Sequence, residues 1–466
     1  MEGNSRGNTV DSLTWKERIG YSMGAIPGGF FSSFMGQIQA FYVAWMKLDW
    51  SWIILAQIIY AIWNVLNDPL FGILQDKTRR RDGRYIPWIK FSGPFFTIAF
   101  IMVFFPPQSL RFELAGIDRQ IPLFFWYLIS QILYDTFFTI IFLAQSSLLP
   151  QMTANVTERT KISIIFGLLG IIATGISGLI PLYFLNDPDP GEIQAFQGFV
   201  VIFGLCAILP WVLLVKWVKE RQEFIPPRQY SFKESIKTVF KNPAGRAFVI
   251  YEGITVGINY FLMTSFSFMI AWLYGTNDAY LAANPSWSFW SAISYLIFPF
   301  LGICIGVITV LIIPKYKDVK TAILVSFMFQ AAGFFIAFLG ALPGNNMPFG
   351  VYSLPNSLPL MTFGFFLAAI GLPGDFIYHG PIRADVVDYE EYLHGERREA
   401  IYSGFGCIFS KPMISVALAM VPTIMALFGL VSSNPNNPAD TAMIVPSGNY
   451  SAAITGVAVV SFLIPS

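Results

Sequence analysis

Residues 61–88 read AIWNVLNDPLFGILQDKTRRRDGRYIPW, and this stretch decides the fold. It begins as an apolar run of the kind that crosses a bilayer and ends in a dense group of arginines. Asn64, Asp68, Gly72 and Asp76 recur every four residues, which places them along one stripe of a helix. Because an ionisable group inside such a run is costly, the stripe predicts a membrane-spanning helix with a functional polar face.

The whole chain has the composition of a membrane protein. Of its 466 residues, 55% are hydrophobic and only 12% are charged, and the mean hydropathy is +0.58. Soluble globular chains carry about 25% charged residues. Apolar runs recur along the whole length, so the excess is neither a single anchor nor a leader peptide, and the partner that we expect is the lipid bilayer.

Several functions are excluded by what the sequence lacks. A net charge of +1 gives no reason to expect a nucleic-acid partner. Cys206, Cys304 and Cys407 lie in apolar runs without metal-binding spacing, and His379 and His394 are the only histidines. The sequence contains no phosphate-binding loop and no hydrolase motif, so we expect neither an ATP-driven pump nor an enzyme.

The apolar runs predict twelve membrane spans, because a helix needs about 20 apolar residues to cross the bilayer core. The runs cover approximately residues 19–46, 52–75, 87–106, 122–149, 162–184, 197–217, 247–273, 288–313, 321–342, 358–380, 399–430 and 450–466. The last run ends at Ser466 with no basic tail, which suggests a truncated C-terminus.

The basic residues predict the orientation and the division of the chain. Of 29 Lys and Arg residues, 25 fall in termini and loops on one predicted side, which makes both termini cytoplasmic. The polar stretch 218–246 separates six predicted helices, 1–217, from six others, 247–466. We therefore expect an all-α membrane protein, a monomer of the cell membrane, built as two six-helix bundles joined by a cytoplasmic linker.

Two long strings resemble a known family. Residues 67–88 resemble the second-helix signature of the glycoside-pentoside-hexuronide:cation symporters, the melibiose permease group of the major facilitator superfamily. Residues 384–403, ADVVDYEEYLHGERREAIYS, resemble that group's other signature. The resemblance implies a major facilitator fold and cation-coupled transport of a small organic solute.

The resemblance also implies a cation site. The family uses two carboxylates four residues apart, an Asn before the second carboxylate and a Thr on the fourth helix, which correspond here to Asn64, Asn67, Asp68 and Thr139. Lys411 matches the family's intramembrane lysine and would balance Asp68 when no cation is bound. Because an amide replaces one carboxylate, a proton is slightly favoured over sodium as the coupling ion. We expect no other metal and no cofactor.

The family's sugar-binding residues are absent from this chain. The acids of its first and fourth helices correspond to Gly29 and Phe142, the nearby Trp to Ser146 and the fifth-helix Arg to a position near Gly167. Polar residues that could replace them are Gln37, Asp135, Gln145, Asp375 and Tyr378, with Gln39, Glu252, Asn259 and His379 as further candidates. An interhelical hydrogen bond explains each of these residues at least as well.

The two signatures also predict a cytoplasmic gate, in which charges of the two halves pair when the inner side closes. The expected members are Asp76, Arg79, Arg80, Arg84, Asp385, Asp388, Arg397 and Glu399.

These patterns predict a secondary active transporter that carries a sugar or glycoside together with a proton or a sodium ion. A carrier of lysolipids or other amphiphiles on the same fold stays open, because the sugar-binding acids are missing and Phe is abundant. A membrane sensor that does not transport is disfavoured, since it needs no charges such as Asp68 and Lys411 inside the membrane.

Overall fold

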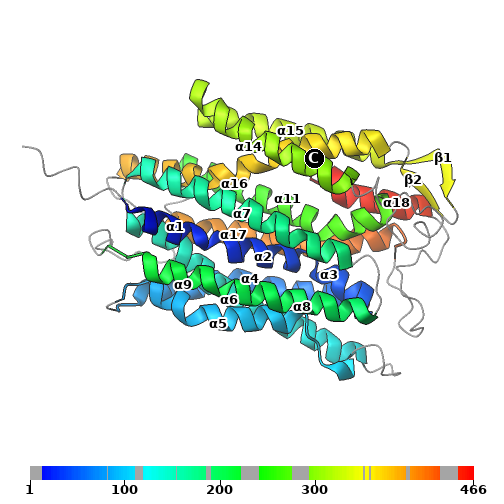
Figure 1. Cartoon of the computed structure of the whole chain (residues 1–466), viewed down its shortest axis with the longest axis horizontal. Helices are drawn as coiled ribbons and strands as arrows, with labels where there is room; N and C mark the ends of the chain where they lie inside the picture. Colours follow the sequence, from blue (N-terminus) through cyan, green and yellow to red (C-terminus); the bar gives the residue numbers. More distant parts are fainter. Residues whose placement is uncertain are drawn as a thin grey trace, which may run out of the picture.

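The computed structural model describes residues 13–80, 82–110, 119–153, 155–184, 190–221, 241–274, 293–349, 352–355, 358–394, 399–430 and 450–465. The helices run roughly along the long axis of an elongated molecule (Figure 1). Ten helices of the described residues are long and apolar enough to cross a bilayer. The prediction of an all-α membrane fold is confirmed to that extent.

The helices fall into an N-terminal and a C-terminal half. The N-terminal half comprises α1 (Trp15–Met23), α2 (Ala25–Gly36), α3 (Ile38–Ala40), the π-helix η1 (Phe41–Trp45), α4 (Trp50–Lys77), α5 (Ile86–Val103), the 3-10 helix η2 (Gln108–Leu110), α6 (Gln120–Met152), α7 (Val156–Phe184), α8 (Pro190–Cys206) and α9 (Ile208–Trp217). The C-terminal half comprises α11 (Pro243–Leu273), the π-helix η5 (Ile293–Ile297), α14 (Phe298–Tyr316), α15 (Val319–Ala341), α16 (Leu358–His394), α17 (Glu399–Leu427), α18 (Tyr450–Ala458) and the π-helix η6 (Val459–Leu463). A short antiparallel hairpin, β1 (Pro343–Phe349) and β2 (Tyr352–Pro355), joins α15 to α16.

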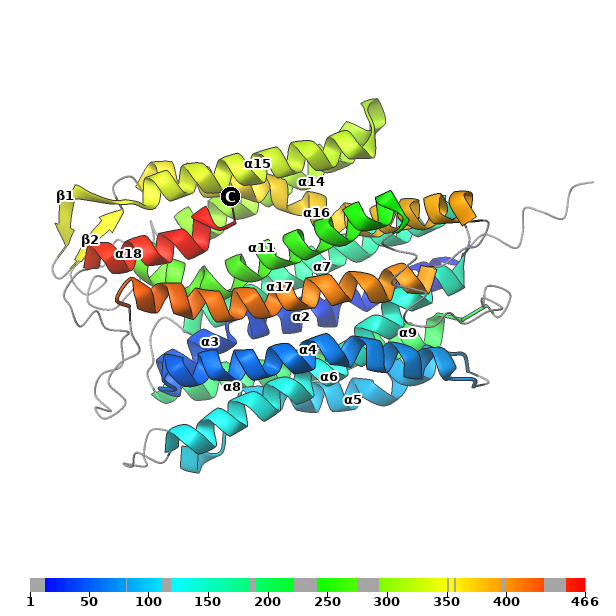
Figure 2. The ribbon, with the colours of Figure 1, turned by 180° about the vertical axis from the view of Figure 1, so that it is seen from behind.

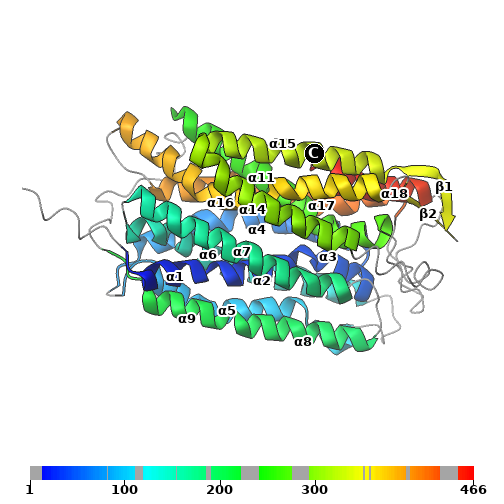
Figure 3. The same cartoon turned by 45° about the horizontal axis from the view of Figure 1, so that its top comes forward.

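The two halves lie on opposite sides of the molecule and meet along a few helices. Helices from α11 onward gather on one side and α1 to α9 on the other (Figure 3), and Figure 2 shows α7 and α17 passing through the middle of the molecule. The contact between them runs mainly along α4 against α17 and along α7 against α16. The candidate site described below lies at the first of these contacts.

The first predicted span, residues 19–46, is interrupted rather than continuous. It is divided at Gly24 and at Gln37 into α1, α2, α3 and η1. The Gln145 amide of α6 lies where a Cβ atom of residue 24 would stand, so a larger residue at this position requires the Gln145 side chain to move. At the second break, Gln37 donates a hydrogen bond to the Met263 carbonyl of α11 at 2.5 Å.

Glycines allow α15 and α16 to pack with their backbones almost in contact. A Cβ atom at Gly364 would collide with the backbone of Ala337, and one at Gly333 would collide with the backbone of Ala368. Lipid chains are as apolar as side chains, so helices in membranes associate through such close packing and not through the hydrophobic effect. These two glycines therefore fix the distance between the helices.

We predict that Gly364→Ala destabilises the protein by about 1–3 kcal/mol, because the added methyl group forces the two backbones apart. Thermal unfolding of the purified protein in one detergent measures the effect. Gly175→Ala is the matched control, since no atom lies within 4 Å of a Cβ built at that exposed position. Equal unfolding temperatures for the two variants would contradict the packing account.

Candidate functional site

Helix α4 turns one polar face inward and one apolar face outward. Its outward stripe includes Ile62, Leu66 and Leu70, which are 64%, 58% and 48% exposed. Asn64, Asn67 and Asp68 lie on the opposite face and are buried. A helix that exposes its apolar residues and buries its polar ones suits a lipid solvent, and it delivers these three polar side chains to the interior.

Helices α6 and α17 supply the groups that surround this polar face. Asp135 and Thr139 stand four residues apart on α6, and Lys411 and Ser415 stand four residues apart on α17. Residues at this spacing share one face of a helix. All four side chains are buried and face α4.

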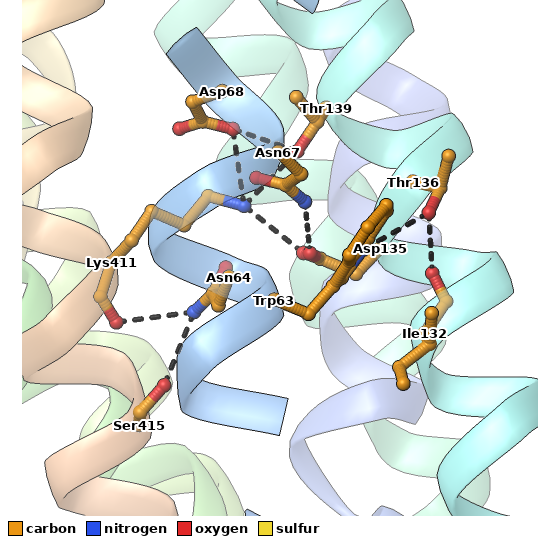
Figure 4. A network of polar contacts seen from close by, with 10 residues as sticks. All are labelled: Trp63, Asn64, Asn67, Asp68, Ile132, Asp135, Thr136, Thr139, Lys411 and Ser415. Carbon is orange, nitrogen blue, oxygen red and sulfur yellow. Dashed lines mark hydrogen bonds and ion pairs between the residues drawn. The ribbon is translucent and has the colours of Figure 1, made fainter. Parts of the chain in front are cut away.

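The Lys411 ammonium lies between two carboxylates of the N-terminal half (Figure 4). Its Nζ is 3.0 Å from Asp135 Oδ1 and 3.6 Å from Asp68 Oδ1, and it donates a hydrogen bond to Thr139 Oγ1 at 3.1 Å. The Phe138 ring adds a cation–π contact, with its centroid 5.6 Å from Nζ. We call Asp68, Asp135 and Lys411 the charge cluster.

Neutral side chains complete the network around the charge cluster. Thr139 donates to Asp68 Oδ1 at 2.8 Å, and the Asn67 amide donates to Asp135 Oδ2. The Asn64 amide donates to the Lys411 carbonyl at 3.1 Å. Because α4 and α6 belong to one half and α17 to the other, this network holds the two halves together.

Three buried oxygen atoms at the site lack a hydrogen-bond donor among the described residues. They are Asn64 Oδ1, Asn67 Oδ1 and Asp68 Oδ2, all from α4. Buried polar atoms are almost always paired in folded proteins, so unpaired acceptors point to a missing donor or cation. Oxygen atoms are also the ligands that hard cations prefer.

A small cavity adjoins the charge cluster. Its volume is about 40 Å³. One water molecule needs roughly 10–15 Å³, so the cavity has room for only a few waters. Its walls combine aromatic and polar side chains and include Tyr60, Gln131, Tyr134, Asp135, Phe138, Tyr260 and Lys411. In this arrangement the cavity can hold an ion but not a sugar.

The structure brings together all five residues of the predicted cation site, and it adds Asp135 to them. The sequence had suggested Asp135 as a substrate ligand, whereas its contacts belong to Lys411 and Asn67. Its four-residue spacing from Thr139 is the signal that could have assigned it, because the two side chains share one face of α6. Tyr60 and Tyr260 were not singled out in the sequence, where tyrosines in apolar runs carry no distinguishing pattern.

Three of the predicted substrate residues make interhelical hydrogen bonds. Gln37 donates to Met263 as described above, and Gln145 donates to the Tyr21 carbonyl at 3.2 Å. The Tyr378 hydroxyl donates to the Val310 carbonyl at 2.6 Å. Each contact is an interhelical hydrogen bond, which was the alternative to ligand binding for these residues. Gln39 behaves in the same way and donates to the Leu418 carbonyl at 2.6 Å.

Asp375 lies in a second polar group, between α11 and α16 of the C-terminal half. Its carboxylate accepts hydrogen bonds from the Tyr251 hydroxyl at 2.6 Å and from the Asn259 amide at 3.2 Å. Nearby, Glu252 Oε1 is 3.5 Å from an Arg383 nitrogen and 3.6 Å from His379 Nε2. The group thus places two carboxylates, one arginine and one histidine together within one half.

The positions of the family's sugar-binding residues serve packing in this chain. A Cβ atom at Gly29 would lie 2.8 Å from both Ala173 Cβ and Thr174 N of α7. Phe142 stacks on Phe138 with 4.5 Å between ring centroids. An acidic side chain at Gly29 would have no space. The expected absence of a galactoside site of the family pattern therefore has a steric reason at this position.

The predicted gate is only partly within the described residues. Arg397 lies outside them, as do the side chains of Asp76 and Glu399. Of the described members, Arg79, Arg80 and Arg84 line a groove beside the end of α9. Asp385 and Asp388 lie near the end of α16.

Several known proteins are similar to this chain. The inner membrane symporter YicJ of Escherichia coli is 23% identical over 58% of this chain and 57% of its own length. The isoprimeverose transporter of Lactiplantibacillus pentosus is 22% identical over 91% of this chain and 82% of its own. The sodium-dependent lysophosphatidylcholine symporter 1 of Xenopus tropicalis is 28% identical over 45% of this chain and 43% of its own length.

Solved structures share the fold. The xylose transporter XylE from E. coli, in a partially occluded inward-open conformation, superposes with a TM-score of 0.55 at 11% identity, over 96% of each chain. Residues 20–464 match the family described as MFS/sugar transport protein. The predictions of a transport protein rather than an enzyme, and of a major facilitator symporter family, are thereby confirmed. The chain belongs to the MFS/sugar transport protein family.

Proposed function

We propose that this chain carries a sugar or glycoside across the cell membrane together with one monovalent cation. The charge cluster with its three unpaired oxygens carries the proposal, because a cluster of this kind in the membrane interior is costly unless it serves an ion. Relatives named as an isoprimeverose transporter and a putative glycoside/cation symporter support the solute class.

The proposal includes a topology of twelve spans. The interrupted segment Trp15–Trp45 and the segment Tyr450–Leu463 would join the ten long helices as the first and the last span. Residues 1–217 and 247–466 would then form two six-helix bundles joined by a linker at 218–246. Lys and Arg are concentrated in the connections after the second, fourth, sixth, eighth and tenth spans, which supports cytoplasmic termini. We take the working unit to be a monomer.

Charge balance supports a single coupling ion. Two ionised aspartates and one protonated lysine carry a net charge of −1, and one monovalent cation neutralises it. Asn64 stands where the family has one of its two carboxylates, and Asp135 on α6 supplies a second carboxylate to the site. The unpaired oxygens supply further ligands. This number of oxygen ligands favours sodium, because a proton needs only one acceptor while a dehydrated sodium ion needs several.

Coupling follows from the position of the charge cluster between the halves. A cation that binds Asp68 and Asp135 weakens their attraction for Lys411, and the contact of α4 and α6 with α17 loosens. The halves then move apart around the cavity, whose tyrosines and Lys411 receive the solute. Cation and solute raise each other's affinity by the same factor, since binding coupling is reciprocal.

A lysolipid or another amphiphile is the second candidate solute. The steric block at Gly29 removes one acid that a sugar would use, and a sodium-dependent lysophosphatidylcholine symporter is among the relatives. The aromatic walls of the cavity suit either class, because aromatic rings stack on sugars and also pack against acyl chains.

A thermal-shift screen distinguishes the two classes of solute. We predict that one or more sugars or glycosides raise the unfolding temperature, and that sodium increases this shift, because a ligand of the native state stabilises it by about 2.7 kcal/mol at 100 times its Kd. Potassium at equal ionic strength is the control. Stabilisation by lysolipids alone would replace the sugar assignment by the second candidate.

We further predict that Asp68→Asn abolishes uphill accumulation of the identified solute while downhill exchange continues, because the amide removes one negative charge from the ion site. Uptake of labelled solute into vesicles, with and without a sodium gradient, measures both processes. Asp318→Asn, which changes an exposed loop carboxylate, is the control and keeps wild-type accumulation. Accumulation by Asp68→Asn at the wild-type level would place the coupling ion elsewhere.

A further inference from the structure

A groove with a strong positive charge lies where α4 and α9 end and α5 begins. Its volume is about 820 Å³, and its walls come from the connection between α4 and α5 and from the last residues of α9 and beyond. Six basic side chains line it, namely Arg79, Arg80, Arg84, Lys90, Lys216 and Lys219. We call this feature the basic groove. It contains part of the signature that had been expected to form a gate.

Among the described residues, Asp82 and Glu220 are the acidic ones that line the basic groove, so six basic residues and two acidic ones face it there, and Arg80, Lys90, Lys216 and Lys219 are exposed. The Glu220 carboxylate is also occupied, because it accepts hydrogen bonds from the backbone N–H groups of Arg84, Tyr85 and Ile86 at the start of α5. Glu220 therefore shapes the groove by capping the first turn of α5.

An exposed apolar surface leads along α9 to the basic groove. Leu205 at the end of α8 and Leu209 and Val212 on α9 are 56%, 63% and 52% exposed. Lys216 continues their spacing of three to four residues along the same face. The apolar stripe therefore ends at Lys216, which lines the basic groove. On α5, which packs against α9, Phe91 is 64% exposed and directly follows Lys90.

We propose that the basic groove binds the headgroup phosphate of an anionic phospholipid, whose acyl chains lie along the exposed faces of α9 and α5. The combination of a cationic groove with an adjoining apolar stripe fits a molecule that has an anionic head and a hydrocarbon tail. A soluble phosphate compound would have no use for the stripe. The basic loops also indicate the cytoplasmic leaflet, where anionic lipids attract Lys and Arg near the membrane.

Native mass spectrometry of the detergent-purified full chain tests this proposal. Phosphatidylglycerol and phosphatidylcholine with identical acyl chains are added in turn, and the fraction of lipid-bound protein gives each Kd. We expect tighter binding of phosphatidylglycerol. Each basic residue near an anionic surface is worth roughly a fivefold change in affinity. The double variant Lys216→Gln/Lys219→Gln should therefore bind phosphatidylglycerol about 20-fold more weakly than the wild type.

The double variant Lys317→Gln/Lys320→Gln is the matched control, because it removes two exposed basic residues, one from the connection between α14 and α15 and one from the first turn of α15. We expect it to bind phosphatidylglycerol within about twofold of the wild type. An unchanged unfolding temperature in lipid-free detergent shows that both double variants are folded. Equal affinity of the wild type for the two lipids, or equal losses in the two double variants, would overturn the proposal. Displacement of the lipid by stoichiometric glycerol phosphate would overturn it in favour of a soluble phosphate ligand.

Discussion

One ammonium group, that of Lys411, is shared by two aspartates from the other half of the protein. Lys411 lies 3.0 Å from Asp135 and 3.6 Å from Asp68, all three side chains are buried, and no fourth charge completes the balance among the contacts described. Charges removed from water are costly unless each is paired and hydrogen-bonded. With both aspartates ionised, the packing of α4 and α6 against α17 therefore depends on a cluster that is one positive charge short of neutrality.

This deficit relates the fold to transport. A balanced ion pair has no charge for an added cation to neutralise, whereas this cluster gains both charge balance and a partner for its unpaired oxygens. The gain is available only where α4, α6 and α17 meet, which is the main contact between the halves. A change in the occupancy of the ion site thus acts directly on the interface that must open and close.

The polar stripe of α4 could be predicted from the sequence because charged and amide residues inside an apolar run have few alternatives. Asn64 and Asp68 stood out for this reason, and Lys411 did as well, whereas Asn67 and Thr139 were identified only through the resemblance to the symporter family. Asp135 was singled out only as a possible substrate residue: its spacing from Thr139 indicates a shared face of α6, but its contacts with Asn67 and Lys411 come from two other helices and are seen only in the structure. Long apolar helices were predictable in the same way, whereas the interruptions of the first segment depend on side chains contributed by other helices.

The solute site was less predictable from the sequence, for a physical reason. Gln37, Gln145 and Tyr378 each satisfy a backbone carbonyl of a neighbouring helix, and a polar residue in an apolar run carries no mark that separates this role from ligand binding. Close approaches, such as that of Gly29 to α7, are also invisible in the sequence, although they decide which ligands fit.

The most direct test of the shared ammonium is a double-mutant cycle on Lys411 and Asp135, measured as the free energy of unfolding in one detergent. Lys411→Gln should destabilise the protein by about 3–5 kcal/mol, because it leaves two buried carboxylates uncompensated. Adding Asp135→Asn removes one of these charges and should recover part of the loss, with a coupling energy of about 1–3 kcal/mol. If the effects of the two substitutions instead add to within about 0.5 kcal/mol, Lys411 and Asp135 are energetically independent and the account is contradicted.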